Sequence, residues 1–311
     1  MRTITTLVPV VSSKGHVSRR RSTSEPAWVR WLLIGAALGF LALFLVLPLI
    51  SVFVQAFAKG FDFYVKTLSE PNALSAIKLT LLAAGISVPL NCVFGVAAAW
   101  AITKFDFRGK NVLLTLIDLP FSISPVISGL VWVLVFGTQG WLGLYENSDH
   151  PALPWLAKWL NVEDFQIIFA VPGIVLATLF VTFPFVAREL IPLMQAQGRV
   201  EEEAARVLGA TGWQTFWRVT LPNIKWGLLY GVILCNARAM GEFGAVSVVS
   251  GHIRGKTNTI PLHVEILYNE YNFTGAFAVA SLLALLALVT LGVKSWVEYK
   301  TASLVEKQEN A

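Results

Sequence analysis

The chain has 311 residues, of which 55% are hydrophobic and only 14% are charged, and its mean hydropathy is +0.65. Soluble domains carry about 25% charged residues, so this composition excludes a water-soluble protein and indicates a chain embedded in lipid. The net charge of +5 comes from short basic segments between apolar stretches rather than from one basic face, which argues against a nucleic-acid-binding protein.

The predicted membrane helices begin after a polar N-terminal segment. Residues 1–30 are rich in serine and arginine and predict a disordered cytoplasmic tail. The apolar stretch over 31–57 is longer than the core of a signal peptide, so it predicts a helix that stays in the membrane. Five further apolar stretches have about the 20 residues that a membrane-spanning helix needs. They lie at 79–102, 112–136, 172–194, 224–250 and 274–297. We therefore predict an all-α membrane protein with a six-helix transmembrane domain over 31–297 and a cytoplasmic tail over 298–311.

The predicted span over 112–136 is interrupted by Pro120 and Pro125, with three serines close by. A proline inside a helix leaves a backbone carbonyl without its donor, which lipid cannot satisfy. We therefore expect this span to face protein or a water-filled path, with Ser124 and Ser128 as candidates for the lining of that path.

The distribution of basic residues predicts the orientation. With the N-terminus inside, the cytoplasmic segments hold sixteen Lys and Arg residues and the outer segments hold six. Cytoplasmic loops carry the excess of positive charge in membrane proteins, so both termini are expected in the cytoplasm. The outer, periplasmic segment over 137–171 contains aromatic and leucine residues at helical spacing. It predicts either a short helix lying flat at the membrane surface or a loop folded over the bundle.

The cytoplasmic segment over 195–223 carries local signals for two short helices. Three glutamates, at 201–203, favour the positively polarised start of the first helix, and Gly209 fits its C-terminal cap. Thr211 and Gln214 have the spacing of a capping box for the second helix. Pro222 fits the first turn of the next span. From these signals alone, the first helix is either a docking surface or an ordinary solvated helix.

The run Glu203-Ala204-Ala205, then Gly209, then Leu221-Pro222 resembles the EAA loop of permease subunits of ATP-binding-cassette (ABC) importers. The resemblance implies the type I importer permease fold, as in the MetI and ModB permeases. It also implies that this loop is the coupling helix that docks on a cytoplasmic ATPase. The ATPase-coupling residues implied here are Glu203, Ala204, Ala205, Gly209 and Pro222.

Two ionisable residues, Arg238 and Glu242, lie four residues apart within the predicted span over 224–250. Charged groups inside a membrane span are costly and usually face the bundle interior or a water path. At this spacing they share a helix face and can pair. The pair is either part of an anion path, since guanidinium suits oxyanions, or a structural ion pair.

The residues around this pair indicate the substrate branch. The segment over 236–251 resembles the sulfate, molybdate and tungstate branch of the permeases, and 253–265 resembles the CysW type more than its CysT-type partner. This resemblance implies a lipid-embedded inner-membrane subunit that pairs with a CysT-type sister permease. It further implies two CysA-type ATP-binding subunits and a periplasmic sulfate- or thiosulfate-binding protein. The resemblance does not distinguish sulfate from thiosulfate as the substrate, and a molybdate or tungstate permease is the alternative. The 141–165 stretch departs from the family pattern.

The sequence offers no sign of catalysis by this chain. The run Gly251–Thr257 imitates a phosphate-binding loop, but only three residues separate its glycines where four are required. Cys92, Cys235 and the four scattered histidines form no disulfide or metal pattern. We expect no cofactor, with ATP–Mg bound by the partner ATPase. An ion-coupled secondary transporter is the rival class, but the internal repeats typical of that class are not evident.

Overall fold

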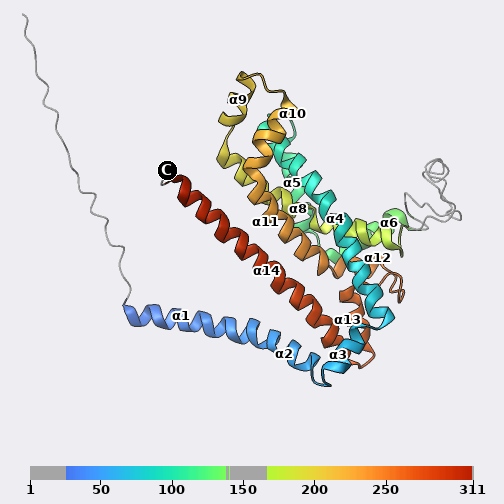
Figure 1. Ribbon diagram of the computed structural model, residues 1–311. Helices are drawn as coiled ribbons and strands as arrows, with labels where there is room; N and C mark the ends of the chain where they lie inside the picture. Colours follow the sequence, from blue (N-terminus) through green and yellow to red (C-terminus); the bar gives the residue numbers. More distant parts are fainter. Residues whose placement is uncertain (1–25, 138–139, 141–166, 310–311) are drawn as a thin grey trace, which may run out of the picture. The chain divides into compact units, whose positions relative to one another are not determined.

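The structure is a computed structural model that describes residues 26–137, 140 and 167–309 (Figure 1). Within these ranges every regular element is a helix. The predicted periplasmic segment over 137–171, with its 141–165 stretch, falls almost entirely outside the described residues. The same holds for most of the predicted tail over 1–30.

The chain divides into two compact units, residues 1–48 and 49–311. Helix α1 (Ala27–Leu41) of the first unit continues through a π-helical turn, η1 (Ala42–Val46), into α2 (Leu47–Ala56), most of which belongs to the second unit. This helical stretch begins at Ala27, four residues before the predicted start, Trp31, and directly after Pro26. The first predicted span is therefore present as one nearly continuous helix of 30 residues.

The second unit contains the remaining helices. They are α3 (Phe61–Leu68), α4 (Pro71–Lys104), α5 (Lys110–Ser122), α6 (Pro125–Phe136), α8 (Val171–Gln197), α9 (Val200–Val207), α10 (Gly212–Thr215), the π-helical turn η2 (Phe216–Thr220), α11 (Leu221–Met240), α12 (Gly244–Val249), α13 (Ile260–Asn269) and α14 (Phe273–Glu309). Helix α14 runs well past the predicted boundary at residue 297.

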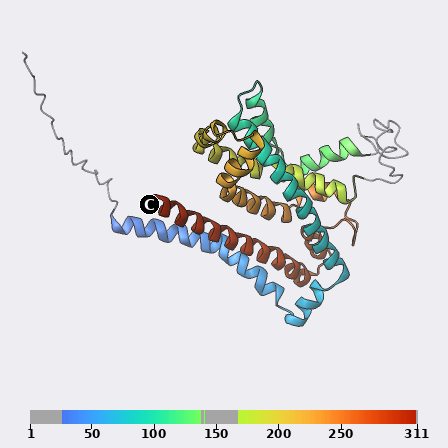
Figure 2. The same ribbon diagram turned by 45° about the horizontal axis from the view of Figure 1, so that its top comes forward.

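Helix α8 is the centre of the second unit, because α4 and α11 both pack against it (Figures 1 and 2). Polar side chains join these helices. The Asn91 amide on α4 donates hydrogen bonds to Thr182 Oγ1 at 2.7 Å and to the Leu179 carbonyl at 3.3 Å, and Ser87 donates to the Val175 carbonyl at 3.2 Å. Since apolar burial does not drive helices together in lipid, such polar contacts and close packing hold the bundle.

The short helices mark the two ends of the second unit (Figure 1). At one end, α9 and α10 lie beside the end of α4, and an ion pair joins Lys104 to Glu202 there. At the other end lie α3 and α13, and Ile260 of α13 bonds to Thr80 near the start of α4. Successive long helices therefore run between the same two ends, as a multi-pass membrane protein requires.

The described part of the structure does not contain one long helix for each of the six predicted spans. Within the described residues, four helices are long and apolar enough to cross a membrane, and five if the bent α5–α6 pair counts as one span. The prediction of one continuous span over 224–250 is wrong, because α11 ends at Met240 and α12 starts only at Gly244. The glycines at 241 and 244 and the buried Glu242 interrupt the helix, which hydrophobicity alone did not reveal.

Candidate functional site

Helix α9 presents an exposed face at the end of the bundle. Val200, Val207 and Leu208 have exposed fractions of 76%, 87% and 88%. Together with Glu203 and Ala204, which are also exposed, they recur at intervals of three and four residues and so lie on one side of the helix. Apolar side chains this exposed in a loop outside the membrane are typical of a surface that another protein covers.

The opposite side of α9 is fastened to the membrane helices. Glu202 forms a 3.1 Å ion pair with Lys104 at the end of α4, and its other oxygen accepts a 2.7 Å hydrogen bond from Thr220. The Asn223 amide in the first turn of α11 donates to Glu201. A force on α9 therefore reaches α4 and α11 through short polar contacts.

The turn after α9 has the predicted geometry. Gly209 has a left-handed backbone with φ of +89°, and the Ala210 N–H donates to the Ala205 carbonyl at 3.0 Å. These contacts form a C-terminal cap, which favours glycine because it has no side chain to strain. The capping box is also present: Thr211 accepts from the Gln214 N–H, and the Gln214 side chain accepts from the Thr211 N–H. Both predicted caps are confirmed.

The predicted coupling residues lie in this loop at different depths. Glu203, Ala204 and Gly209 are exposed, Ala205 is half-buried, and Pro222 is in the first turn of α11. Their role in docking stays a prediction. The sequence reasoning missed the three apolar residues of the exposed face, although their helical spacing from Glu203 was a usable signal.

Two broken helices meet in the interior of the second unit. Helices α5 and α6 form an angle of 107° across their break. The second break separates α11 from α12, and α12 packs against α6. A β-carbon added to Gly244 would lie 3.0 Å from the Pro125 Cβ, and one added to Gly129 would lie 2.6 Å from the Ala245 carbonyl oxygen. These glycines let the two broken segments touch, so one side of the interrupted backbone packs on protein, while Ser122 and Ser124 at the α5–α6 break are exposed. That this span faces protein or a water-filled path stays a prediction.

The predicted ion pair lies at this junction. Arg238 Nη1 is 2.6 Å from Glu242 Oε2, and the Glu242 side chain is 1% exposed while that of Arg238 is 33% exposed. The other Glu242 oxygen accepts a 3.0 Å hydrogen bond from the Ala245 N–H at the start of α12. The pairing of Arg238 with Glu242 is therefore confirmed. The Glu242 carboxylate joins the end of α11 to the start of α12, and the Arg238 side chain remains one-third exposed.

The two predicted serines differ in environment. Ser124 is exposed at the start of α6, directly before Pro125, and so lies beside the junction. Ser128 is 3% exposed, and its hydroxyl has no hydrogen-bond partner among the described residues. The structure brings Ser124 close to the segment that holds Glu242, whereas Ser128 lies one turn further into α6.

A second ion pair within the bundle was missed. Arg188 on α8 lies 2.9 Å from Asp118 on α5, and its guanidinium lies over the Phe121 ring at 4.9 Å from the ring centre. The signal was present in the sequence, since Asp118 is the one charged residue in the predicted span over 112–136 and Arg188 lies beside Glu189 in the predicted span over 172–194. Only the fold shows that the two charges meet.

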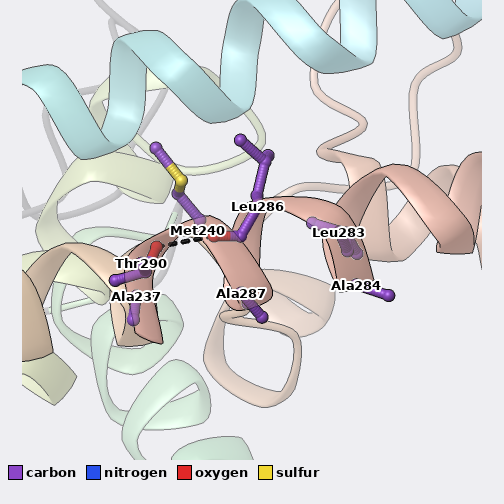
Figure 3. A pocket seen from close by; sticks show the side chains of 8 residues that line it. Ala237, Met240, Leu283, Ala284, Leu286, Ala287 and Thr290 are labelled. Atoms are coloured by element: carbon purple, nitrogen blue, oxygen red, sulfur yellow. Dashed lines mark hydrogen bonds between the residues drawn. The ribbon is translucent and has the colours of Figure 1, made fainter. Parts of the chain in front are cut away.

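A cavity of about 290 Å³ lies between α11 and α14 (Figure 3). Ala237, Met240 and Gly241 line the cavity on the α11 side. Small residues of α14, such as Ala287, line it on the other side. No charged side chain lines it, so it does not resemble an anion site. It instead leaves room for the end of α11 to shift at its break. Within the described part of the chain, no group of three or more His, Cys, Asp or Glu side chains could hold a metal ion.

Comparison with known proteins finds relatives that are permease components of transport systems. Residues 91–302 match the family model "Binding-protein-dependent transport system inner membrane component". The sulfate transport system permease protein CysW of Synechocystis sp. is 54% identical over 273 residues, which cover 88% of this chain and 94% of that protein. The CysW protein of Escherichia coli is 50% identical over 91% of each chain. The Escherichia coli CysT protein is less similar, at 35% identity over 84% of this chain and 89% of its own length.

Among solved structures, a bacterial alginate ABC transporter in complex with an alginate-pentasaccharide-bound periplasmic protein has a chain of the same fold. The TM-score is 0.68 with 18% identity, covering 89% of this chain and 95% of that chain. The likeness confirms the predicted all-α importer-permease fold. One family model matches two thirds of the chain, and at least half of the aligned residues are identical to those of the two CysW proteins. The chain therefore belongs to the family of binding-protein-dependent transport system inner membrane components, in the branch that contains the CysW permeases.

Proposed function

We propose that this chain is a pore-forming permease subunit of an ABC importer for sulfate or thiosulfate, without catalytic activity of its own. The observation that carries this proposal is the exposed apolar face of α9, held rigidly on the ends of α4 and α11. A docking surface fixed to the membrane helices in this way suits a subunit that is moved by a separate ATPase. The identity with CysW permeases supports the choice of substrate.

The proposed complex has a CysT-type sister permease, two CysA-type ATP-binding subunits and a periplasmic binding protein. In this arrangement the segment over 195–223, with both termini, faces the cytoplasm, and the segment over 137–171 faces the periplasm. The basic residues at the α9 end of the bundle, such as Lys104, Arg199 and Arg218, support this orientation. The domain boundaries proposed from the sequence, with the membrane domain over 31–297, follow the same topology.

The proposed mechanism uses α9 as the coupling helix. ATP–Mg binds between the partner ATPase subunits and closes them, which moves the docked α9 through the apolar face and Glu203, Ala204, Ala205 and Gly209. The polar contacts of Glu202 transfer this movement to α4 and to Thr220, directly before α11, and the contact of Glu201 with Asn223 transfers it to the first turn of α11, which contains Pro222. The broken segments at the junction then rearrange, and the pore changes from inward-open to outward-open.

The proposed anion path passes the junction of the two broken helices. The Arg238 side chain is partly exposed there and pairs with the buried Glu242. Ser124 is exposed directly before Pro125, which packs against Gly244, and the buried Ser128 follows one turn later in α6. Guanidinium binds oxyanions through paired N–H donors, so this chemistry fits sulfate and thiosulfate. It fits molybdate and tungstate as well, which keeps a molybdate or tungstate permease as the second candidate.

The test is uptake by the four-component importer in proteoliposomes. ATP-dependent uptake of radiolabelled sulfate is expected, with thiosulfate as a strong competitor and molybdate as a weak one. Strong inhibition by molybdate would instead favour the second candidate. Sulfate uptake that follows an ion gradient without the ATPase would contradict the importer proposal and favour a secondary transporter.

The docking role is tested by co-purification. Val207→Asp and Leu208→Asp place charges on the exposed face of α9, and we expect them to release the ATPase subunit while the permeases stay paired. Glu201→Gln, on the fastened side, is the matched control and is expected to keep the ATPase bound. Normal co-purification of the Asp variants would argue against α9 as the docking site.

A further inference from the structure

The ion pair between Arg188 and Asp118 is unusual in its exposure. It joins α8 to α5, yet the two side chains are 56% and 48% exposed. The guanidinium uses its Nε for Asp118 and rests on the Phe121 ring. Among the described residues, no oxygen accepts a hydrogen bond from its two terminal nitrogens. One edge of the arginine is therefore occupied, and the other edge is open.

The pair lies deep within two membrane helices. With a rise of about 1.5 Å per residue, Arg188 is ~14 Å from the Gln197 end of α8, and Asp118 is ~12 Å from the Lys110 end of α5. Both measurements start at the α9 end of the bundle, so the two charges lie at one level. By the same arithmetic Arg238 lies ~26 Å from the Leu221 end of α11. The two arginines therefore occupy two levels along the bundle.

Lipid is an unfavourable neighbour for this pair. Charged groups at hydrocarbon depth are costly when they face acyl chains, so such groups usually face a water path or protein. Phe121 is the second-to-last residue of α5, which ends at Ser122, where the α5–α6 break begins. The other side of that break packs on Gly244, next to Glu242. Arg188 thus contacts the α5 segment before the break, and Arg238 pairs with Glu242 near the α6 segment after it.

We propose that Arg188, backed by Phe121 and balanced by Asp118, forms a second anion-binding station nearer the α9 end, which receives a divalent tetrahedral oxyanion after it leaves Arg238. This inference rests on the proposed function, since it names a further step in the same passage. The open edge of the guanidinium provides two N–H donors suited to an oxyanion. Asp118 competes for the same guanidinium and so keeps binding weak. A conducting pathway needs such weak, multiple sites, because the ion must leave each one again.

Cysteine accessibility tests the environment of the station. In the importer with Cys92→Ala and Cys235→Ala, Arg188→Cys is treated from the α9 side with an anionic methanethiosulfonate reagent. We expect rapid modification. In Asp118→Cys, which keeps Arg188, an at least tenfold excess of sulfate over its KM is expected to slow the modification severalfold. Arg254→Cys is the control, because Arg254 forms an ion pair of nearly the same exposure at the opposite end of the bundle. It is expected to be unreactive from this side.

An unreactive Arg188→Cys would overturn the proposal, because it would place the residue against lipid or inside a subunit interface. Modification of Asp118→Cys that sulfate does not slow would also overturn it, since water alone would then reach the site. Asp118→Cys probes the same level from α5, so poor assembly of the first variant does not remove the test.

Uptake measurements test the binding role. Arg188→Gln is expected to lower sulfate uptake at least tenfold with ATPase docking intact, whereas Arg188→Lys keeps a larger share because it keeps the charge. Asp118→Asn is expected to lower the KM for sulfate. Lys110→Gln removes another ion pair of α5, outside the membrane, and is expected to leave uptake unchanged. Full uptake by Arg188→Gln, in an importer whose wild type is active, would reject the second station and leave the proposed function standing. An inactive wild type would reject the proposed function instead.

Discussion

Gly95 on α4 and Val186 on α8 meet so closely that a β-carbon on Gly95 would lie 2.7 Å from the Val186 Cβ. Val186 is fully buried, and a β-carbon on Gly231 of α11 would lie 3.3 Å from its Cα. Glycines on two neighbouring helices therefore enclose one valine of the central helix. In lipid, this kind of close backbone approach supplies much of the attraction between helices.

Gly95→Ala is expected to destabilise the bundle by about 1–3 kcal/mol, because the added methyl group overlaps Val186 and forces α4 and α8 apart. Gly85→Ala, in the same helix, is the control, since a β-carbon there meets nothing within 4 Å. Thermal unfolding of the detergent-purified importer measures both. Equal midpoints for the two variants would contradict the packing described here.

Gly209→Ala is expected to impair transport by straining the turn that ends α9. A non-glycine residue in the left-handed region costs about 1–2 kcal/mol, and the turn fixes the direction of α9. Gly212→Ala is the control, because Gly212 has ordinary backbone angles and open space around it. Sulfate uptake and ATPase co-purification are measured together. Unchanged values for Gly209→Ala would show that the cap geometry does not matter for coupling.

Glu202→Ala is expected to uncouple ATP hydrolysis from transport. It removes the contacts to Lys104 and Thr220 but leaves the exposed face of α9 unchanged, so the ATPase still docks. The number of sulfate ions transported per ATP hydrolysed should fall severalfold. Thr220→Val removes the hydrogen bond alone and should give a smaller loss. A normal ratio in Glu202→Ala would show that the force reaches α4 and α11 by another route.

Arg238→Gln is expected to reduce sulfate uptake strongly, whereas Arg238→Lys keeps part of it, because the ammonium keeps the charge without the paired donors. Glu242 loses its ion-pair partner in Arg238→Gln but keeps its hydrogen bond to the Ala245 N–H, so assembly should survive. Subunit co-purification checks this point. Full uptake by the Gln variant with normal assembly would reduce the pair to a structural role.

Stability should depend on pH through His263 of α13, outside the membrane-spanning helices. Burial lowers the pKa of His263 below its usual value of 6.5, a tendency that Glu70 opposes and Arg254 supports. The folded protein therefore binds this proton less readily than the unfolded chain does. The stabilisation is fully present above about pH 6.5 and is lost progressively as pH falls toward the lowered pKa. Unfolding midpoints between pH 5 and pH 8 should show this loss, and His263→Gln should flatten the profile.

The sequence alone determined the features that depend on local chemistry. Long uncharged stretches required a membrane environment. The basic residues in the loops between them predicted which loops lie on the cytoplasmic side. The caps at Gly209 and Thr211 were predictable because a turn depends on a few neighbouring residues. The pairing of Arg238 with Glu242 was predictable for the same reason, since four residues on one helix bring side chains together.

The tertiary structure decided what depends on residues distant in the chain. Apolar composition could not show that the span over 224–250 breaks after Met240, because the break is held by Glu242 and by the packing of Gly244 on Pro125. The partner of Arg188 also depends on how α5 lies against α8. Helix rotation and helix contact are set by packing between segments, and a single hydrophobic pattern fits many rotations. Only the folded chain selects one of them.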